Sequence, residues 1–193
     1  MYTLYAAIDT AHAVIDRLAP HCERIDMAGS VRRRCNSVKD IEIVCQPKKQ
    51  LKIDATKLFD DGYWVVCDEF QIVLDTVTAA VERGNINGRY MKIILKNGMP
   101  LDLFMPNYSD YYRQLVIRTG SGDYVKNVSA ATWRMLGLCG TDQGLRKMAE
   151  CSPKTGTDGS ISWKCTTEHP KLPPVWQSEE EFFTWLGLPF TPP

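Results

Sequence analysis

An asparagine–glycine pair, Asn97-Gly98, lies between two short apolar segments at 90–95 and 101–105. Asn-Gly is a strong signal for a tight turn between antiparallel strands, because both residues tolerate the left-handed backbone that such turns require. The pair therefore predicts a β-hairpin and fixes the relative direction of its two strands. One acid, Asp102, lies in the second strand among apolar neighbours.

The remaining pattern predicts a mixture of helices and strands. Helices are indicated where apolar residues recur every three or four positions, and strands where short segments alternate. We expect helices at 4–18, 51–59, 73–83, from about 109, at 123–136 and after the capping-box pair Ser178 and Glu181, and strands at 25–28 and 40–45. The segment 151–174 is polar and turn-rich. Because the pattern changes after Pro106, two domains are expected, 1–107 and 108–193.

Charge and composition exclude some classes of protein. Lysine plus arginine equals aspartate plus glutamate at 23 each, so the global basic excess of many nucleic-acid binders is missing. Basic residues are instead concentrated at 32–34, 39, 48–49 and 52, where they could bind phosphates locally. The alternative interpretation of this segment is a solvent-exposed charged face without a ligand.

No apolar stretch approaches the roughly 20 residues that span a bilayer. Seven scattered cysteines without a C-x-x-C pair indicate reduced thiols, so we expect a soluble cytoplasmic protein without membrane contact.

Two carboxylates alternate in Asp40-Ile41-Glu42. On a strand, side chains two positions apart share a face, so Asp40 and Glu42 are expected side by side while Ile41 faces the core. Carboxylates at this spacing can share Mg²⁺, which takes oxygen ligands and binds phosphates. The alternative is an exposed acidic face. Asp102 either points to solvent or joins this pair on a neighbouring strand, where it would be a base or a metal ligand.

Gly29-Ser30 follows the short strand at 25–28 and is expected to open a helical turn. Backbone amides and the serine hydroxyl in such a turn suit a triphosphate, and the arginines at 32–34 add positive charge. A simple turn is the alternative. The order of these features along the chain favours phosphate chemistry: a glycine-serine turn, basic residues, two alternating carboxylates and a distant strand aspartate.

These motifs resemble the signature of family X, the polymerase β-like DNA polymerases and nucleotidyltransferases. Gly29-Ser30-Val31-Arg32-Arg33 and Asp40-Ile41-Glu42 are similar to that family's Gly-Ser-x-Arg-Arg and Asp-x-Asp motifs. Asp102 matches its third carboxylate, Thr119-Gly120-Ser121 its Thr-Gly-Ser element, and 178–190 its thumb terminus. The resemblance covers nearly the whole chain. It implies an α+β fold, with a nucleotidyltransferase palm of mixed β-sheet and flanking helices and a small C-terminal α+β thumb domain.

The resemblance also implies an activity, ligands and site residues. A DNA polymerase of this type adds dNTPs to the 3′-hydroxyl of a primer-template or gapped DNA by two-metal catalysis, typically in repair. Asp40, Glu42 and Asp102 would be the catalytic residues that bind Mg²⁺, or Mn²⁺ because Glu42 replaces an aspartate. Nucleotide binding is expected from Gly29, Ser30, Arg33, Lys39, Thr119, Gly120 and Ser121. Nucleic-acid binding is expected from Arg32, Arg34, Lys48, Lys49 and Lys126.

Some residues differ from the family pattern and leave two alternatives. Val125 and Ser129 stand where the family has asparagine and arginine, which favours a nucleotidyltransferase that works without a template or on another acceptor. Glu42 favours a non-catalytic nucleic-acid-binding relic of the fold. The sequence begins at the first palm helix, so we expect neither a lyase nor a fingers region. Minimal members of this kind occur in large DNA viruses, which implies a viral origin and a location in the host cytoplasm.

Overall fold

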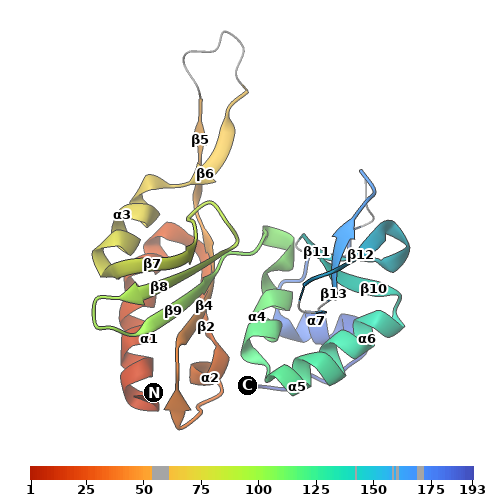
Figure 1. Cartoon of the computed structure of the whole chain (residues 1–193), viewed down its shortest axis with the longest axis horizontal. Helices are drawn as coiled ribbons and strands as arrows, with labels where there is room; N and C mark the ends of the chain where they lie inside the picture. Colours follow the sequence, from red (N-terminus) through yellow and green to blue (C-terminus); the bar gives the residue numbers. More distant parts are fainter. Residues whose placement is uncertain (54–60, 142, 158, 160, 169–171) are drawn as a thin grey trace. The chain divides into compact units, whose positions relative to one another are not determined.

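The chain divides after Pro106 into two units, Met1–Pro106 and Asn107–Pro193, within one residue of the expected boundary. The computed structural model describes residues 1–53, 61–141, 143–157, 159, 161–168 and 172–193. Each unit combines helices with β-sheet, so the chain has a mixed α+β fold (Figure 1). Within the described residues, no helix is both long and apolar enough to cross a bilayer.

A five-stranded sheet is the centre of the first unit (Figure 1). Its only parallel pair joins β4 to β9, and the other neighbours among its described strands are antiparallel. The sheet is therefore mixed, as expected. Its strands are, in spatial order, β2 (Cys22–Ala28), β4 (Ile41–Pro47), β9 (Pro100–Phe104), β8 (Tyr90–Leu95) and β7 (Thr78–Gly84).

Helices α1 (Leu4–Leu18) and α3 (Asp68–Val77) pack on one face of this sheet. Because strand side chains alternate between faces, Ile41 and Ile43 of β4 enter the core under these helices and are fully buried. Glu42, between them, faces the other side and is half-buried. The alternation therefore gives the sheet one apolar, helix-covered face and one face that carries acids.

The hairpin of β8 and β9 forms around Asn97 and Gly98, as predicted. The Gly98 amide donates to the Leu95 carbonyl at 2.8 Å, the Leu95 amide donates to Met99 at 2.9 Å, and Gly98 has a left-handed φ of 83°. The connection is thus a three-residue loop whose last residue needs the conformational freedom of glycine. Asn97 Nδ2 donates to Thr10 Oγ1 of α1 at 3.2 Å, which anchors the turn to that helix.

Shorter elements complete the first unit. A two-stranded arm projects from the sheet (Figure 1). These elements are β1 (Tyr2–Thr3), paired with β3 (Ser37–Val38); the 3₁₀ turn Ala19–His21; α2 (Gly29–Arg32); and the arm strands β5 (Lys49–Lys52) and β6 (Tyr63–Val66).

Two of the helix predictions for the first unit are wrong in part. Leu51 and Lys52, placed in a helix at 51–59, instead belong to β5 and pair with β6; residues 54–60 lie outside the described residues. The helix expected at 73–83 is α3, which starts earlier and ends at Val77, after which β7 pairs with β8. Here pairing with a neighbouring strand outweighs the helical spacing of the apolar residues. That spacing shows which side of a segment is apolar, but it does not show which element the segment pairs with.

The second unit has helices packed against a four-stranded sheet of order β11-β10-β13-β12. Its core contains Trp133, Trp176 and Phe182, with Ser178 capping the last helix through a bond from the Glu181 amide at 3.2 Å. Its elements are a 3₁₀ turn (Tyr108–Asp110), α4 (Tyr111–Thr119), α5 (Gly122–Tyr124), a π-helical segment (Val125–Ser129), α6 (Ala130–Met135), β10 (Leu138–Thr141), β11 (Gly144–Lys147), a 3₁₀ turn (Met148–Glu150), β12 (Cys151–Thr155), β13 (Ile161–Cys165) and α7 (Glu179–Leu186).

The resemblance implies β-structure in the second unit, but the sequence pattern predicts none of its individual strands. Its strands β12 and β13 lie in the segment 151–174, where the sequence is polar. All of their residues are exposed or half-buried, so they lack the apolar alternation by which a strand is recognised.

A buried ion pair lies inside the second unit. Arg113 Nε and Nη2 donate to the two carboxylate oxygens of Asp110 at 2.5 and 2.6 Å, and the side chains are only 4% and 8% exposed. Gln114 Nε2 adds a bond to Asp110 at 3.1 Å. The bidentate hydrogen bonding between the two side chains offsets the free-energy cost of removing both charges from water.

Removing one partner of this pair should destabilise the second unit strongly. We expect Asp110→Ala to lower its free energy of unfolding by about 3 kcal/mol or more, because Arg113 would stay buried without its counter-charge. Asp110→Ala combined with Arg113→Met should recover part of that loss. Urea unfolding followed by tryptophan fluorescence measures both.

The exposed pair Lys52–Asp68, at 3.0 Å, is the control. Asp68→Ala should change stability little, since water screens both groups. Equal effects of Asp68→Ala and Asp110→Ala would contradict the assignment of a buried, stabilising ion pair.

Candidate functional site

Glu42 and Asp102 are direct neighbours on the acid-bearing face of the first sheet. They occupy matching positions of the parallel strands β4 and β9, and both are half-buried. Neighbouring strands run about 4.8 Å apart, so the two side chains leave the sheet beside each other. Of the two alternatives for Asp102, the register favours the one in which a neighbouring strand brings it beside Glu42.

Asp102 is held by residues of β8. Tyr90 donates its hydroxyl hydrogen to Asp102 Oδ1 at 2.9 Å, and the Tyr90 ring packs on Phe104 with centroids 5.1 Å apart. Lys92 lies opposite Asp102 across the β8–β9 pairing, and its ammonium is 3.6 Å from Glu82. Tyr90 therefore restricts rotation of the Asp102 carboxylate, whereas the charge of Lys92 is paired with Glu82.

The Glu42 carboxylate lies against Gly29. A Cβ built on Gly29 would overlap the Glu42 carboxylate, and its backbone has a left-handed φ of 66°. Ala28, the residue before it, lies opposite Glu42 across the β2–β4 pairing. Position 29 thus needs glycine both for its backbone and for the space that Glu42 occupies. The glycine-serine turn and the second carboxylate are in contact.

Asp40 is the least well placed of the three predicted carboxylates. It lies one residue before β4, outside the regular strand, and is half-buried. Among the residues that the structure describes, no group of three or more His, Cys, Asp or Glu side chains is close enough to hold a metal ion. The carboxylates are hard oxygen donors suited to Mg²⁺ or Mn²⁺, but only Glu42 and Asp102 are already side by side.

The basic turn after Ser30 is closed by a Schellman cap. The Cys35 amide donates to Ser30 O at 2.9 Å and the Arg34 amide to Val31 O at 3.0 Å. Arg34 takes the left-handed position, with φ 56°, where glycine is usual, and its side chain is exposed. Arg32 and Arg33 are half-buried and Lys39 is exposed. The cap fixes the backbone that carries the three arginines directly after Gly29.

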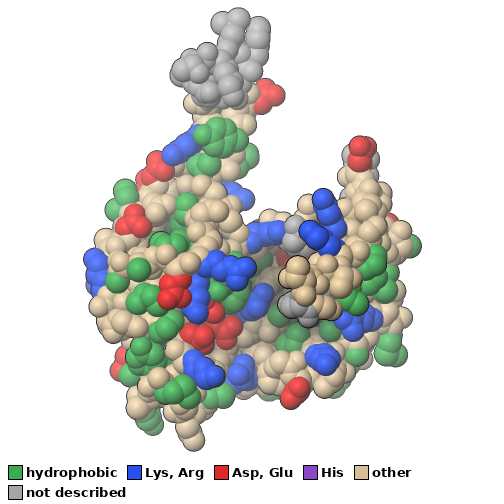
Figure 2. All heavy atoms as spheres, viewed as in Figure 1, with side chains coloured by type: hydrophobic (Ala, Val, Ile, Leu, Met, Phe, Trp, Pro, Cys, Tyr) green, Lys and Arg blue, Asp and Glu red, His purple; other side chains and the backbone are tan. Residues whose placement is uncertain are grey.

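The predicted basic segment is separated into two groups. Lys48 and Lys49 follow the far end of β4, about 20 Å along the strand from Glu42. Lys48 Nζ donates to Pro20 O at 2.8 Å. Figure 2 shows acidic side chains gathered on the first unit with Lys and Arg side chains beside them. The arginines of α2 and its cap, with Lys39, precede β4 at the end that carries Glu42.

The remaining predicted residues belong to the second unit. Thr119 ends α4 and is buried, and the Ser121 hydroxyl accepts from the Tyr124 amide at 3.2 Å as the cap of α5. Gly120 is crowded: an added Cβ would lie 2.8 Å from Val125 Cγ2. Lys126 is exposed. In this unit the Thr-Gly-Ser element forms a tight helix-to-helix corner.

Sequence reasoning missed Tyr90 and Lys92. Both lie on alternate positions of β8, so they share one face, but only the hairpin register shows that this face is the one with Asp102. A two-residue turn at Asn97-Gly98 would have shifted the register by one residue and removed Lys92 from Asp102. The length of the loop, three residues, was therefore what the sequence analysis lacked to place Tyr90 and Lys92 beside Asp102.

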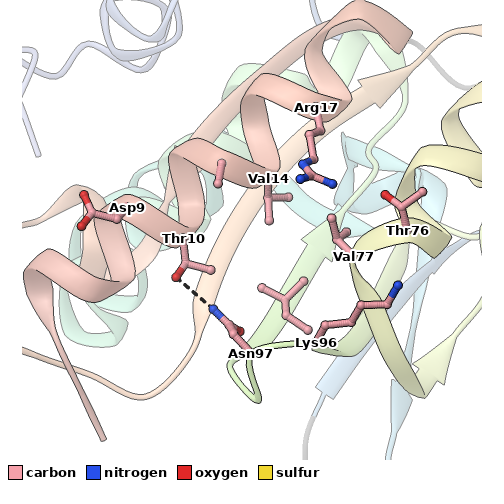
Figure 3. Close-up of a pocket in the computed structure, with 10 residues that line it drawn as sticks. Asp9, Thr10, Val14, Arg17, Thr76, Val77, Lys96 and Asn97 are labelled. Carbon is pink, nitrogen blue, oxygen red and sulfur yellow. Dashed lines mark hydrogen bonds between the residues drawn. The ribbon is translucent and has the colours of Figure 1, made fainter.

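A separate pocket of about 430 Å³ lies on the helix-covered side of the first unit (Figure 3). It is bounded by α1, the end of α3 and the β8–β9 turn, with Val14 and Val77 among its apolar lining. Arg17 and Lys96 lie toward the Thr76 end and Asp9 toward the other. Because the sheet separates this pocket from Glu42 and Asp102, it is not part of the candidate site.

Comparisons with known proteins give no match: no family model matches the chain, and no curated protein sequence matches it.

The contact between Gly29 and Glu42 can be tested by adding one methyl group. Gly29→Ala should lower the free energy of unfolding by about 2 kcal/mol or more, since it combines a strained left-handed backbone with displacement of Glu42. Gly98→Ala is the matched control, because Gly98 has a similar φ of 83° but no neighbouring atom within 4 Å. It should cost about 1 kcal/mol, from backbone strain alone.

Chemical denaturation of both variants measures the difference between them. If Gly29→Ala cost no more than Gly98→Ala, the Glu42 side chain would not lie where the structure places it.

Proposed function

We propose that the chain is a metal-dependent nucleotidyltransferase that adds deoxynucleotides from dNTPs to a DNA 3′-hydroxyl. The observation that carries the proposal is the register of β4 and β9, which makes Glu42 and Asp102 neighbours on one sheet face. The contact of Glu42 with Gly29 adds support, because it joins the carboxylates to the glycine-serine turn. The ordered resemblance to the polymerase β family supplies the reaction type.

Asp40, Glu42 and Asp102 would hold the magnesium or manganese ions. Ions bound there would neutralise the triphosphate and stabilise the charge that develops as pyrophosphate leaves. The Glu42 side chain has three rotatable bonds, so its carboxylate can turn from Gly29 toward Asp102 without movement of β4. Tyr90 keeps Asp102 oriented through its 2.9 Å hydrogen bond, which lowers the cost of ordering that carboxylate.

Other residues of the first unit would bind the nucleotide and DNA. Ser30, Arg33 and Lys39 are proposed to contact the triphosphate, and Arg32 and Arg34 the DNA backbone. The formal net charge is +0, so attraction to DNA has to come from local groups of this kind. Binding should therefore weaken steeply as salt is raised.

Primer extension tests the proposal. On a gapped duplex with Mg²⁺ or Mn²⁺, wild-type protein should incorporate dNTPs, and Asp102→Asn should lower the rate at least about 100-fold because it removes a charged ligand and proton acceptor. Asp75→Asn is the matched control: Asp75 is an exposed aspartate of α3, which packs on the other face of the sheet. It should leave the rate unchanged.

Absence of incorporation by the wild type, or full activity of Asp102→Asn, would contradict the proposal. If the protein bound DNA but did not bind dNTP with Mg²⁺ in a calorimetric titration, it would instead be a non-catalytic relic.

A template-independent nucleotidyltransferase is the second candidate. Ser129, which stands where the family has an arginine, is fully buried, and Val125 packs against Gly120. Neither position therefore offers a polar side chain for checking a base pair. This candidate predicts equal incorporation of all four dNTPs on a single-stranded primer and on a gapped duplex, measured under the same conditions. Strict dependence on the templating base would exclude it.

A further inference from the structure

Three cysteine thiols meet on the sheet of the second unit. Cys151 is the first residue of β12 and Cys165 the last residue of β13, and the two lie directly opposite each other. Cys139 of β10 is hydrogen-bonded with Cys151. Cys139 is buried and the other two are half-buried, and all three are free thiols. Nothing in the proposed nucleotidyl transfer uses them.

The strand register makes Cys151 and Cys165 suitable for a cross-strand disulfide. The Thr166 amide donates to Glu150 O at 3.0 Å, so the next pair outward is the hydrogen-bonded one. Because hydrogen-bonded and non-hydrogen-bonded pairs alternate along an antiparallel ladder, Cys151 and Cys165 form a non-hydrogen-bonded pair. Cα atoms of such pairs are about 4.5 Å apart, within the range of about 4.4 to 6.8 Å that a disulfide spans.

We propose that Cys151 and Cys165 form a reversible disulfide on reaction with a small-molecule disulfide such as oxidised glutathione, and that this bond closes the β12–β13 hairpin. The covalent link would join the ends of the two strands at the point where their ladder begins. Oxidation would thereby stabilise the second unit.

The environment of the thiols determines which sulfur reacts first. Burial raises the pKa of Cys151 to about 12, and its hydrogen bond with Cys139 acts in the same direction. Burial also raises the pKa of Cys139. Cys151 therefore remains a protonated thiol at neutral pH, and the thiolate is the attacking species in disulfide exchange. The first attack is thus assigned to the other thiol of the pair, Cys165.

The exchange takes place in two balanced steps. The Cys165 thiolate attacks one sulfur of oxidised glutathione, which forms a mixed disulfide and releases one glutathione thiolate. Cys151 then loses its proton and attacks the Cys165 sulfur, so the second glutathione leaves as a thiolate. Two protein thiols are oxidised and one glutathione disulfide is reduced to two thiols. Because Cys151 has to lose a proton, the second step should accelerate as pH is raised from 7 to 9.

Peptide mapping tests the proposal on the full chain. Native protein is incubated with oxidised glutathione, its remaining thiols are alkylated, and non-reduced peptides are identified by mass spectrometry. The wild type and Cys139→Ser should both give a linked Cys151–Cys165 peptide that dithiothreitol removes. The linked protein should melt at a temperature higher by on the order of 10 °C, since the bond closes a 15-residue loop.

The chain contains its own comparison pair. Cys22 and Cys45 are hydrogen-bonded neighbours in the first unit, but both are buried, and burial raises the pKa of Cys45 well above its usual value. This pair should be alkylated only after unfolding. The proposal is overturned if Cys151 and Cys165 remain unlinked at pH 9, or if the main bond joins either of them to Cys139.

Discussion

The parallel pairing of β4 with β9 is the constraint on which the candidate site depends. It sets Glu42 beside Asp102, which are 60 positions apart in the sequence. The pairing is held by Ile41, Ile43, Leu101 and Leu103, which are fully buried under the helices. A shift of one residue in the strand register would turn the acidic side chains into this core, where burying an unpaired charge costs free energy. Apolar burial on one face therefore positions the carboxylates on the other.

Much of the first unit can be predicted from local sequence, because its strands alternate and its turns have specific residues. Asn97-Gly98 predicts the hairpin, and the acids alternate with aliphatic residues. What could not be predicted depends on partners distant in sequence. The helical spacing at 73–83 does not show that β8 pairs with residues 78–84. The contact between Glu42 and Gly29 likewise arises only when β2 lies beside β4.

The second unit is held together in a different way. Its core is aromatic, with Trp176 packed edge-on against Phe182 at 4.7 Å, and the Asp110–Arg113 pair is buried in the same unit. Its polar strands β12 and β13 could not be recognised from the sequence, because none of their residues is buried. The same polar hairpin places Cys151 opposite Cys165. A segment that looks like a loop in the sequence thus carries two thiols that lie opposite each other across a hairpin.

The central claim is that Glu42 and Asp102 hold divalent cations beneath a triphosphate. X-ray diffraction from crystals grown with Mn²⁺ and a non-hydrolysable dNTP analogue tests it most directly, since manganese is located by its anomalous signal. We expect manganese in direct contact with oxygens of both Glu42 and Asp102, and the triphosphate beside Ser30 and Arg33. Manganese bound elsewhere, with Glu42 still against Gly29 and no nucleotide near it, would contradict the account.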